Sequence, residues 1–150
     1  MQSLLAPMRT KTQTFCVDAT NVVRRAYGYG GPQFRAQEES DGQHLIMALA
    51  DVCQRHEDLV ALDVVFDGPW RAGSQSLPGN LRLRFAREGG ADEMILDRVR
   101  ALRHGGERVT VVTSDSELAD LVREEGGRLL TPRSGGIDGV AAAIEARLRA

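Results

Sequence analysis

The sequence has 150 residues, of which 42% are hydrophobic and 27% are charged, and its formal net charge at pH 7 is -2. These values are typical of one globular domain, and they exclude a protein that attracts nucleic acid through a strongly positive overall field. No apolar stretch approaches the ~20 residues of a membrane-spanning helix, and the segment before Lys11 lacks the apolar core of a secretory signal. We expect a frayed or disordered N-terminus over residues 1–12 and a single domain over residues 13–150.

Both cysteines, Cys16 and Cys53, lie within apolar patterns and form neither a CxxC motif nor a metal-binding spacing. We interpret them as free core side chains, because unpaired cysteine is among the residue types most often found in protein interiors. Reduced thiols indicate a cytoplasmic protein.

The first apolar run covers residues 14–18 and ends abruptly in Asp18. This pattern predicts a buried strand that carries a carboxylate at its C-terminal edge. A short helix is expected over residues 20–27. The glycine-rich segment that follows lacks the lysine of a phosphate-binding P-loop, and we expect a polar loop up to Ser40. Ser40 and Asp41 are then expected to cap a second helix with one apolar stripe.

Two further strands are expected in the middle of the chain. Residues 62–67 form an apolar run that ends in Asp67, and residues 81–85 alternate strictly between apolar residues and arginine. A period of two predicts an edge strand with its leucines facing the core and Arg82 and Arg84 facing outward.

Helices and strands also alternate in the last part of the chain. The expected elements are a helix over residues 91–104, a strand over 109–114, a helix up to Glu125, a short strand over 128–130 and a final helix capped by Asp138. The strand at 109–114 is rich in β-branched residues, which is typical of a central position. Ser114 and Glu117 have the spacing of a capping box at the start of the following helix.

Strands that alternate with helices are joined by right-handed crossovers and pair in parallel. We therefore predict a three-layer α/β/α fold with a mostly parallel five-stranded sheet in the order 3-2-1-4-5. The strand order of such a sheet reverses between the first and fourth strands, and ligands bind at the carboxyl ends of the strands beside that point. Asp18 and Asp115 are expected to lie there.

Three expected strands deliver an acid to the same edge of the sheet, namely Asp18, Asp67 and Asp115. Taken singly, each acid is explained by an ordinary turn or helix cap, and Asp92 and Glu93 by the dipole of a helix whose first turn they occupy. Taken together, carboxylates that converge on one edge repel one another and raise one another's pKa values. A hard divalent cation removes that cost, so the pattern predicts a Mg²⁺ or Mn²⁺ site.

Four segments carry a resemblance to a known family. They are Val17–Val22 (VDATNV), Val65–Gly68 (VFDG), Phe85–Ile95 (FAREGGADEMI) and Val112–Leu118 (VTSDSEL). These segments resemble, in the same order, the VDGxNxx opening, the VFDG segment, the ADxxI helix start and the TSDxxL segment of the NYN (YacP-like) ribonucleases, within the PIN-like and flap-nuclease group. The resemblance spans residues 14 to about 134 and implies a PIN-like fold and an RNA-cleaving activity.

By matched motif, the resemblance implies that Asp18, Asp92 and Asp115 are catalytic metal ligands. Asn21 matches the motif asparagine, and a supporting role in orienting Asp18 or a phosphate is expected for it. Asp67 matches a further metal-site position that reaches the ion through water. Asp120 and Glu93 are reserve candidates.

The chain departs from the family pattern at two places. Ala19 replaces the usual glycine, which is a small change. The helix expected after Ser40 lacks the acid or arginine that many relatives carry there, and Asp41 is a poor substitute.

Arginines are the expected contacts to the phosphates of a nucleic acid, because residues 70–90 hold four arginines against Glu88 alone and the planar guanidinium suits bidentate phosphate binding. Base bias of the genome is an alternative explanation for Lys11 being the only lysine. The candidates are Arg24, Arg25, Arg71, Arg82, Arg84, Arg87 and Arg133. Stacking by Tyr27, Tyr29 and Trp70 is an alternative to an ordinary solvated surface for these aromatic residues. The residues themselves fit RNA or DNA, and the resemblance implies single-stranded or structured RNA.

The leading hypothesis is a metal-dependent endoribonuclease in which water activated by Mg²⁺ or Mn²⁺ attacks the phosphorus in line and leaves a 5′-phosphate and a 3′-hydroxyl. The alternative is a PIN-like RNA- or protein-binding module whose activity has decayed. A haloacid-dehalogenase-type phosphatase is disfavoured because Asp18-Ala19-Thr20 is not DxD, and a phosphotransfer receiver because Arg133, not lysine, follows the fifth strand.

Overall fold

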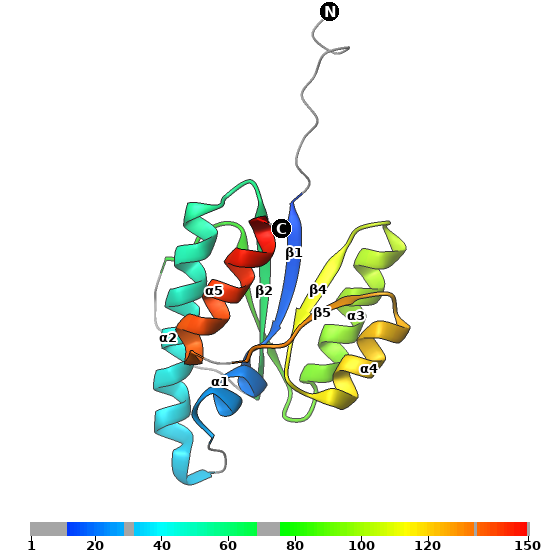
Figure 1. Ribbon diagram of the computed structural model, residues 1–150. Coiled ribbons are helices and arrows are strands. Elements are labelled where there is room, and N and C mark those ends of the chain that lie inside the picture. Colours follow the sequence, from blue (N-terminus) through cyan, green and yellow to red (C-terminus); the bar gives the residue numbers. More distant parts are fainter. Residues whose placement is uncertain (1–11, 29–31, 69–75, 134, 150) are drawn as a thin grey trace, which may run out of the picture.

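The computed structural model describes residues 12–28, 32–68, 76–133 and 135–149 (Figure 1). The strands are β1 (Gln13–Asp18), β2 (Val60–Asp67), β3 (Leu81–Ala86), β4 (Val109–Val112) and β5 (Arg128–Leu130). The helices are α1 (Ala19–Tyr27), α2 (Arg35–Arg55), α3 (Ala91–His104), α4 (Ser116–Glu124) and α5 (Gly136–Arg149), and a single 3-10 turn, η2 (Pro32–Phe34), precedes α2.

The five strands form one sheet in the order β3-β2-β1-β4-β5, and every neighbouring pair is parallel. The predicted fold class and strand order are therefore confirmed. β1 lies in the middle, where Val17 is level with Val64 of β2 and Val112 of β4. The carboxyl ends of β1, β2 and β4 consequently meet along one edge of the sheet.

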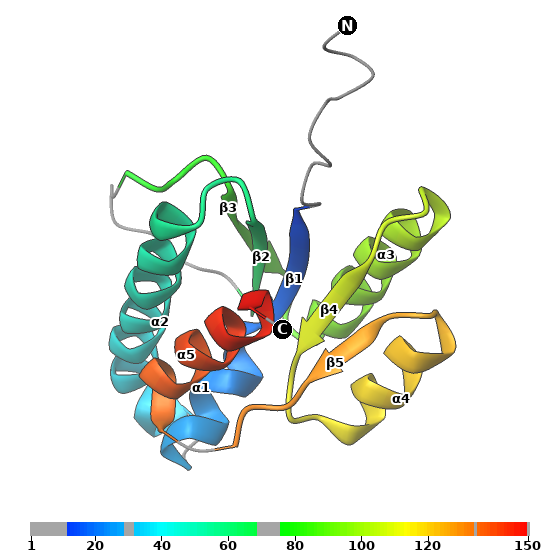
Figure 2. The same cartoon turned by 45° about the horizontal axis from the view of Figure 1, so that its top comes forward.

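Helices cover both faces of the sheet and complete three layers (Figures 1 and 2). The alternation of side chains in β1 shows how the layers are built. Phe15 and Val17 point to the side of α1, α2 and α5, whereas Cys16 points to the side of α3 and α4, and all three side chains are fully buried. Each face of β1 thus contributes to a separate apolar core. No helix in the described ranges has the length and apolar character needed to cross a membrane.

The second helix starts earlier than the sequence patterns predict. α2 begins at Arg35, so Asp41 is not a cap but a buried residue inside the helix, and the amide of Gln37 donates to its carboxylate at 3.1 Å. The segment before Ser40 is polar but consists largely of good helix formers, and Glu38 in the first turn compensates the helix dipole. Polarity alone therefore wrongly indicated a loop.

Two predicted helix caps are also wrong. At α4 the cap is Asp115, whose carboxylate accepts hydrogen bonds from the backbone N–H groups of Glu117 and Leu118 at 2.9 and 3.3 Å. Asp115 has an extended backbone and directly precedes Ser116, the first residue of the helix, whereas Ser114 lies one residue too early to be the cap. At α5 the backbone bond from Gly139 to Gly135 starts the helix earlier, which places Asp138 in the first turn.

Candidate active site

A cleft of about 300 Å³ opens at the carboxyl ends of the strands. Its lining comes from the ends of β1 and β2, the face of α1, the turn before α3 and the junction of β4 with α4. The lining residues are Asp18, Thr20, Asn21, Arg24, Asp67, Gly89, Ala91, Asp92 and Asp115. The structure thus brings together in one cleft Asn21 and the four acids predicted as catalytic or metal-binding, whereas the reserve candidates Glu93 and Asp120 do not line it.

The four acids of the cleft reach it by two structural routes. Asp18 and Asp67 are the last residues of the adjacent parallel strands β1 and β2. Asp92 and Asp115 lie at the N-terminal ends of α3 and α4, the helices on one face of the sheet. Crossover helices begin where the preceding strand ends, so strand ends and helix starts meet at the same edge.

Asp18 is the most deeply buried acid of the cleft, with 4% of its surface exposed. The hydroxyl of Thr113 donates to its Oδ2 at 2.7 Å. The pKa of Asp18 is raised to about 7: burial raises it most, the hydrogen bond from Thr113 lowers it, and the charges of the three other cleft acids raise it. Asp18 is therefore partly protonated near neutral pH when no cation is nearby.

Mutual repulsion also affects the neighbouring carboxyls. The pKa of Asp92 is raised by burial and by the charges of Asp115, Asp67 and Glu117. At Asp67 the backbone N–H donates to Thr20 Oγ1 at 2.8 Å, but the carboxylate Oδ1 is buried without a hydrogen-bond partner. A buried acceptor with no donor is costly unless a ligand occupies it.

The donor set fits a divalent metal ion. All four side chains offer hard oxygen ligands of the kind that Mg²⁺ and Mn²⁺ prefer, and a cation would satisfy the unpartnered Asp67 oxygen and relieve the repulsion. In the side-chain conformations of the described residues, however, no three His, Cys, Asp or Glu groups converge closely enough to hold an ion. Ligation therefore requires these carboxylates to turn toward a common point.

Asn21 is fixed by the polypeptide that follows β4. Its Oδ1 accepts the backbone N–H of Ser114 at 2.8 Å and lies 3.3 Å from Thr113 Oγ1. Thr113 in turn accepts the backbone N–H of Asp115 at 3.1 Å. A single buried hydroxyl therefore links the ends of β1 and β4 with the start of α4.

Thr20 and Thr113 are site residues that the sequence reasoning missed. Thr113 lies within the Thr-Ser-Asp motif, and this position could have indicated a role in the site. Its contact with Asp18, however, joins positions 95 residues apart. Thr20 is next to two motif residues, yet its bond to the backbone of Asp67 depends on how β1 and β2 pair.

The predicted phosphate-binding arginines do not all lie at the cleft. Arg24 lines it, and Arg87 is exposed on the segment that leads from β3 to Gly89 of the cleft wall. Arg25 and Arg133 are exposed elsewhere on the described surface. Arg71, like Tyr29 and Trp70, lies outside the described residues, as does the side chain of Tyr27.

Neither arginine of the edge strand β3 is exposed at the carboxyl edge of the sheet. Arg82 comes at the beginning of β3, and its Nε is 3.9 Å from Asp63, whose other oxygen accepts from Arg98 at 2.7 Å. Arg84 is half-buried, so the prediction that both arginines of this strand face outward is wrong for Arg84. Asp63 is itself 4% exposed, a buried ion pair that the sequence reasoning did not anticipate.

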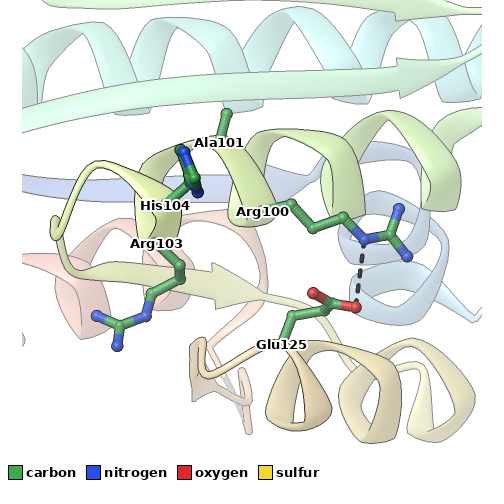
Figure 3. A pocket seen from close by; sticks show the side chains of 5 residues that line it. All are labelled: Arg100, Ala101, Arg103, His104 and Glu125. Carbon is green, nitrogen blue, oxygen red and sulfur yellow. Dashed lines mark ion pairs between the residues drawn. The ribbon is translucent and has the colours of Figure 1, made fainter.

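A second, more open pocket of about 630 Å³ lies between the last turns of α3 and α4 (Figure 3). Its lining contains Arg100, Arg103, His104 and Glu125, and Arg100 is paired with Glu125 at 3.2 Å and with two acids of its own helix. Basic side chains in the last turn of α3 compensate the negative end of the helix dipole. This pocket is at the opposite edge of the sheet from the four acids, and we do not assign the chemistry to it.

Comparison with known proteins agrees with the four motifs. Residues 15–135 match the YacP-like NYN domain family. Two crystal structures of Rae1 (YacP) from Bacillus subtilis, one of them of a mutant, are similar in fold, each at 22% sequence identity. The mutant aligns over 91% of this chain and 79% of its own with a TM-score of 0.63, and the other over 92% and 80% with a TM-score of 0.62. No curated protein matches the sequence significantly.

Proposed function

The chain belongs to the YacP-like NYN domain family, a PIN-like nuclease family, and on this premise we propose that it is a metal-dependent endoribonuclease that hydrolyses phosphodiester bonds. The observation that carries the proposal is the convergence of Asp18, Asp67, Asp92 and Asp115 on one cleft. Four acids in so small a volume destabilise the fold unless they serve a cation.

Asp18, Asp92 and Asp115 are the proposed ligands of Mg²⁺ or Mn²⁺, and Asp67 is the proposed outer ligand. A bound ion of this kind activates water and stabilises the negative charge that develops on a phosphodiester. Thr113 holds the Asp18 carboxylate through its hydrogen bond, and the cap bonds to α4 hold that of Asp115. The proposed products carry a 5′-phosphate and a 3′-hydroxyl.

RNA, single-stranded or structured, is the proposed substrate, because the chain belongs to a ribonuclease family. The proposed backbone contacts are Arg24, Arg25, Arg71, Arg82, Arg84, Arg87 and Arg133. Arg24 and Arg87 are supported best, since they lie in or beside the cleft. A cytoplasmic location is supported by Cys16 and Cys53, which are both buried and unpaired.

A second candidate function is an RNA- or protein-binding module without activity. The observation in its favour is that no three described acids are arranged to hold an ion in the present side-chain conformations. Calorimetry with Mn²⁺ separates the two candidates: uptake that depends on Asp18 supports the nuclease, and no uptake supports the binding module.

The direct test is a time course of cleavage of a labelled, structured RNA pool. Reactions with Mn²⁺, Mg²⁺ or EDTA are run with the protein and with Asp18→Asn. Cleavage that requires the metal and is lost in the variant is the expected result. Full cleavage by Asp18→Asn would refute the site, and no cleavage in any reaction would favour the binding module.

A further inference from the structure

The wall of the cleft that α1 forms carries the hydrogen-bond donors Asn21 and Arg24, whereas the other charged residues of the lining are acids. Asn21 and Arg24 are three residues apart on α1, so they occupy the same face of the helix, with Cβ atoms about 5–6 Å apart. Both line the cleft, and among the described residues Arg24 is its only cationic side chain. A strand of RNA that enters the acidic cleft needs donors of this kind for its phosphates.

The amide of Asn21 has a defined orientation. Its Oδ1 faces the backbone N–H of Ser114 at 2.8 Å, and because an N–H can only donate, the oxygen and not the nitrogen must face Ser114. The proton of the Thr113 hydroxyl goes to Asp18, its shorter contact. The two N–H donors on Nδ2 of Asn21 are left without a partner in the described structure.

Arg24 forms an ion pair with Glu38 of α2. Its Nε donates to Glu38 Oε1 at 2.6 Å. The Arg24 side chain is 48% exposed and that of Glu38 is 21% exposed, so the carboxylate is the more enclosed partner. Only Nε takes part in the pair, and within the described chain the terminal Nη1 and Nη2 groups have no partner.

We propose that Glu38 is a positioning residue that holds Arg24 at the cleft, so that its two terminal amino groups and the side-chain amide of Asn21 bind one phosphate of the RNA strand. The proposal rests on the proposed function for the identity of the substrate. A guanidinium serves this arrangement because its fork binds a carboxylate through Nε and a phosphate through the terminal groups at the same time. A lysine ammonium has no such division of donors.

The opposite role for Glu38 makes a different prediction. A carboxylate that merely neutralises Arg24 competes with phosphate, and its removal then strengthens RNA binding. A positioning carboxylate reduces the conformational freedom that Arg24 loses on binding, and its removal weakens RNA binding. The direction of change on Glu38→Gln therefore separates the two roles.

The test measures binding without catalysis. Fluorescence anisotropy is followed with a short, labelled, single-stranded RNA in EDTA and in Ca²⁺, and kcat and KM for cleavage are measured separately in Mn²⁺. Arg24→Gln is expected to weaken RNA binding about ten-fold, because it removes a charge-assisted hydrogen bond to the phosphate. Glu38→Gln is expected to weaken it about three-fold, because it removes only the residue that positions Arg24. Arg24→Lys is expected to bind almost as poorly as Arg24→Gln. In cleavage, Glu38→Gln is expected to raise KM with little change in kcat.

The double variant shows whether Glu38 acts through Arg24. If it does, Glu38→Gln has no further effect once Arg24 is Gln. The matched controls are Asp51→Asn, which breaks an arginine pair elsewhere on α2, and Arg123→Gln, which breaks an exposed pair on α4. Both controls are expected to bind RNA as the unmodified protein does, and thermal melting of each variant verifies the fold.

The outcomes distinguish the positioning role from the nuclease itself. Tighter binding by Glu38→Gln, or equal effects of Glu38→Gln with and without Arg24, overturns the positioning role. Normal cleavage together with unchanged binding in every variant overturns it too, while the nuclease stands. Weaker binding in the Arg24 and Glu38 variants of a protein that never cleaves supports the phosphate site and overturns the nuclease. An unmodified protein that neither binds nor cleaves RNA overturns both.

Discussion

Thr113 donates a hydrogen bond from its hydroxyl to the carboxylate of Asp18 at 2.7 Å, and both residues are almost completely buried. The bond joins the carboxyl ends of β4 and β1 beside the point where the strand order reverses. Because a hydroxyl donor stabilises the charged form of a carboxylate, Thr113 opposes the effect of burial on the pKa of Asp18.

Thr113→Val preserves the shape of the side chain and removes this donor. The pKa of Asp18 is then expected to rise above its present value of about 7, so less of the carboxylate is ionised at neutral pH. Cleavage is expected to fall about ten-fold at pH 7 and to recover partly at higher pH. The pH profile of kcat/KM measures this shift. Thr110→Val, at a buried threonine of β4, is the control, and an equal pH shift there would contradict the assignment.

The stability of the metal-free protein should fall as the pH rises. The pKa of Asp18 is about 7 in the folded chain, against 3.8 for an ordinary aspartate. Between pH 4 and 7 the folded state therefore binds more protons than the unfolded state, and the free energy of unfolding decreases with pH in that window. Asp18→Asn mimics the neutral acid and should be more stable than the unmodified protein above pH 7, by on the order of 2–4 kcal/mol.

Urea unfolding in EDTA at pH 5 and pH 8 measures this difference. Glu124→Gln, a charge removal at an exposed position of α4, serves as the control and should leave the pH dependence unchanged. Equal stability of Asp18→Asn and the unmodified protein at pH 8 would show that the ionised Asp18 carboxylate does not destabilise the folded state.

Mn²⁺ should stabilise the fold more at pH 8 than at pH 5. Ligation requires ionised carboxylates, and at pH 5 the ion must displace a proton from Asp18, whose pKa is about 7. The shift in melting temperature on adding Mn²⁺ measures the effect, since a ligand that binds only the folded state raises it. Asp18→Asn should lose most of the shift. A shift of the same size in that variant would place the ion elsewhere.

The ion pair between Asp63 and Arg98 should support the fold and not the chemistry. Arg98→Gln leaves the charge of Asp63, 4% exposed, without its close partner, and should destabilise the protein by about 2–4 kcal/mol. Arg82, at 3.9 Å, compensates only in part. Adding Asp63→Asn to Arg98→Gln should restore part of the loss.

Urea unfolding of the single and double variants tests this prediction, with kcat measured on the folded fraction. Arg103→Gln, at an exposed position on the same helix, is the control for removing a positive charge. A loss of kcat in folded Arg98→Gln would mean that the pair also acts on the cleft.

Much of the fold follows from local patterns in the chain. The apolar runs that end in Asp18 and Asp67, and the arginine alternation of β3, predicted strands and their places in the sheet because side-chain periodicity reports which face is buried. The edge where the acids meet followed from parallel pairing alone. Polar segments carry a weaker signal, so their pattern predicts a loop where the first turn of α2, with Glu38, in fact forms a helix.

The contacts within the cleft depend on tertiary structure and leave no local trace. Thr113 meets Asp18 across 95 positions of the chain, and Glu38 meets Arg24 through the packing of α2 on α1. Motif matching placed Asp92 and Asn21 in the cleft, but nothing in the sequence told which atom of Asn21 is already engaged.

One carboxylate oxygen of Asp115 accepts two backbone N–H bonds and so caps α4. Because the same carboxylate is a proposed metal ligand, a substitution at this position can affect both the helix and the chemistry. Alanine there deletes the charge and a helix cap together, and the loss of a cap alone costs about 1 kcal/mol. A dead alanine variant would therefore say little about chemistry. Asparagine keeps a capping oxygen and removes only the charge. Comparing the alanine and asparagine variants therefore separates the role of Asp115 as a helix cap from its role in the active site.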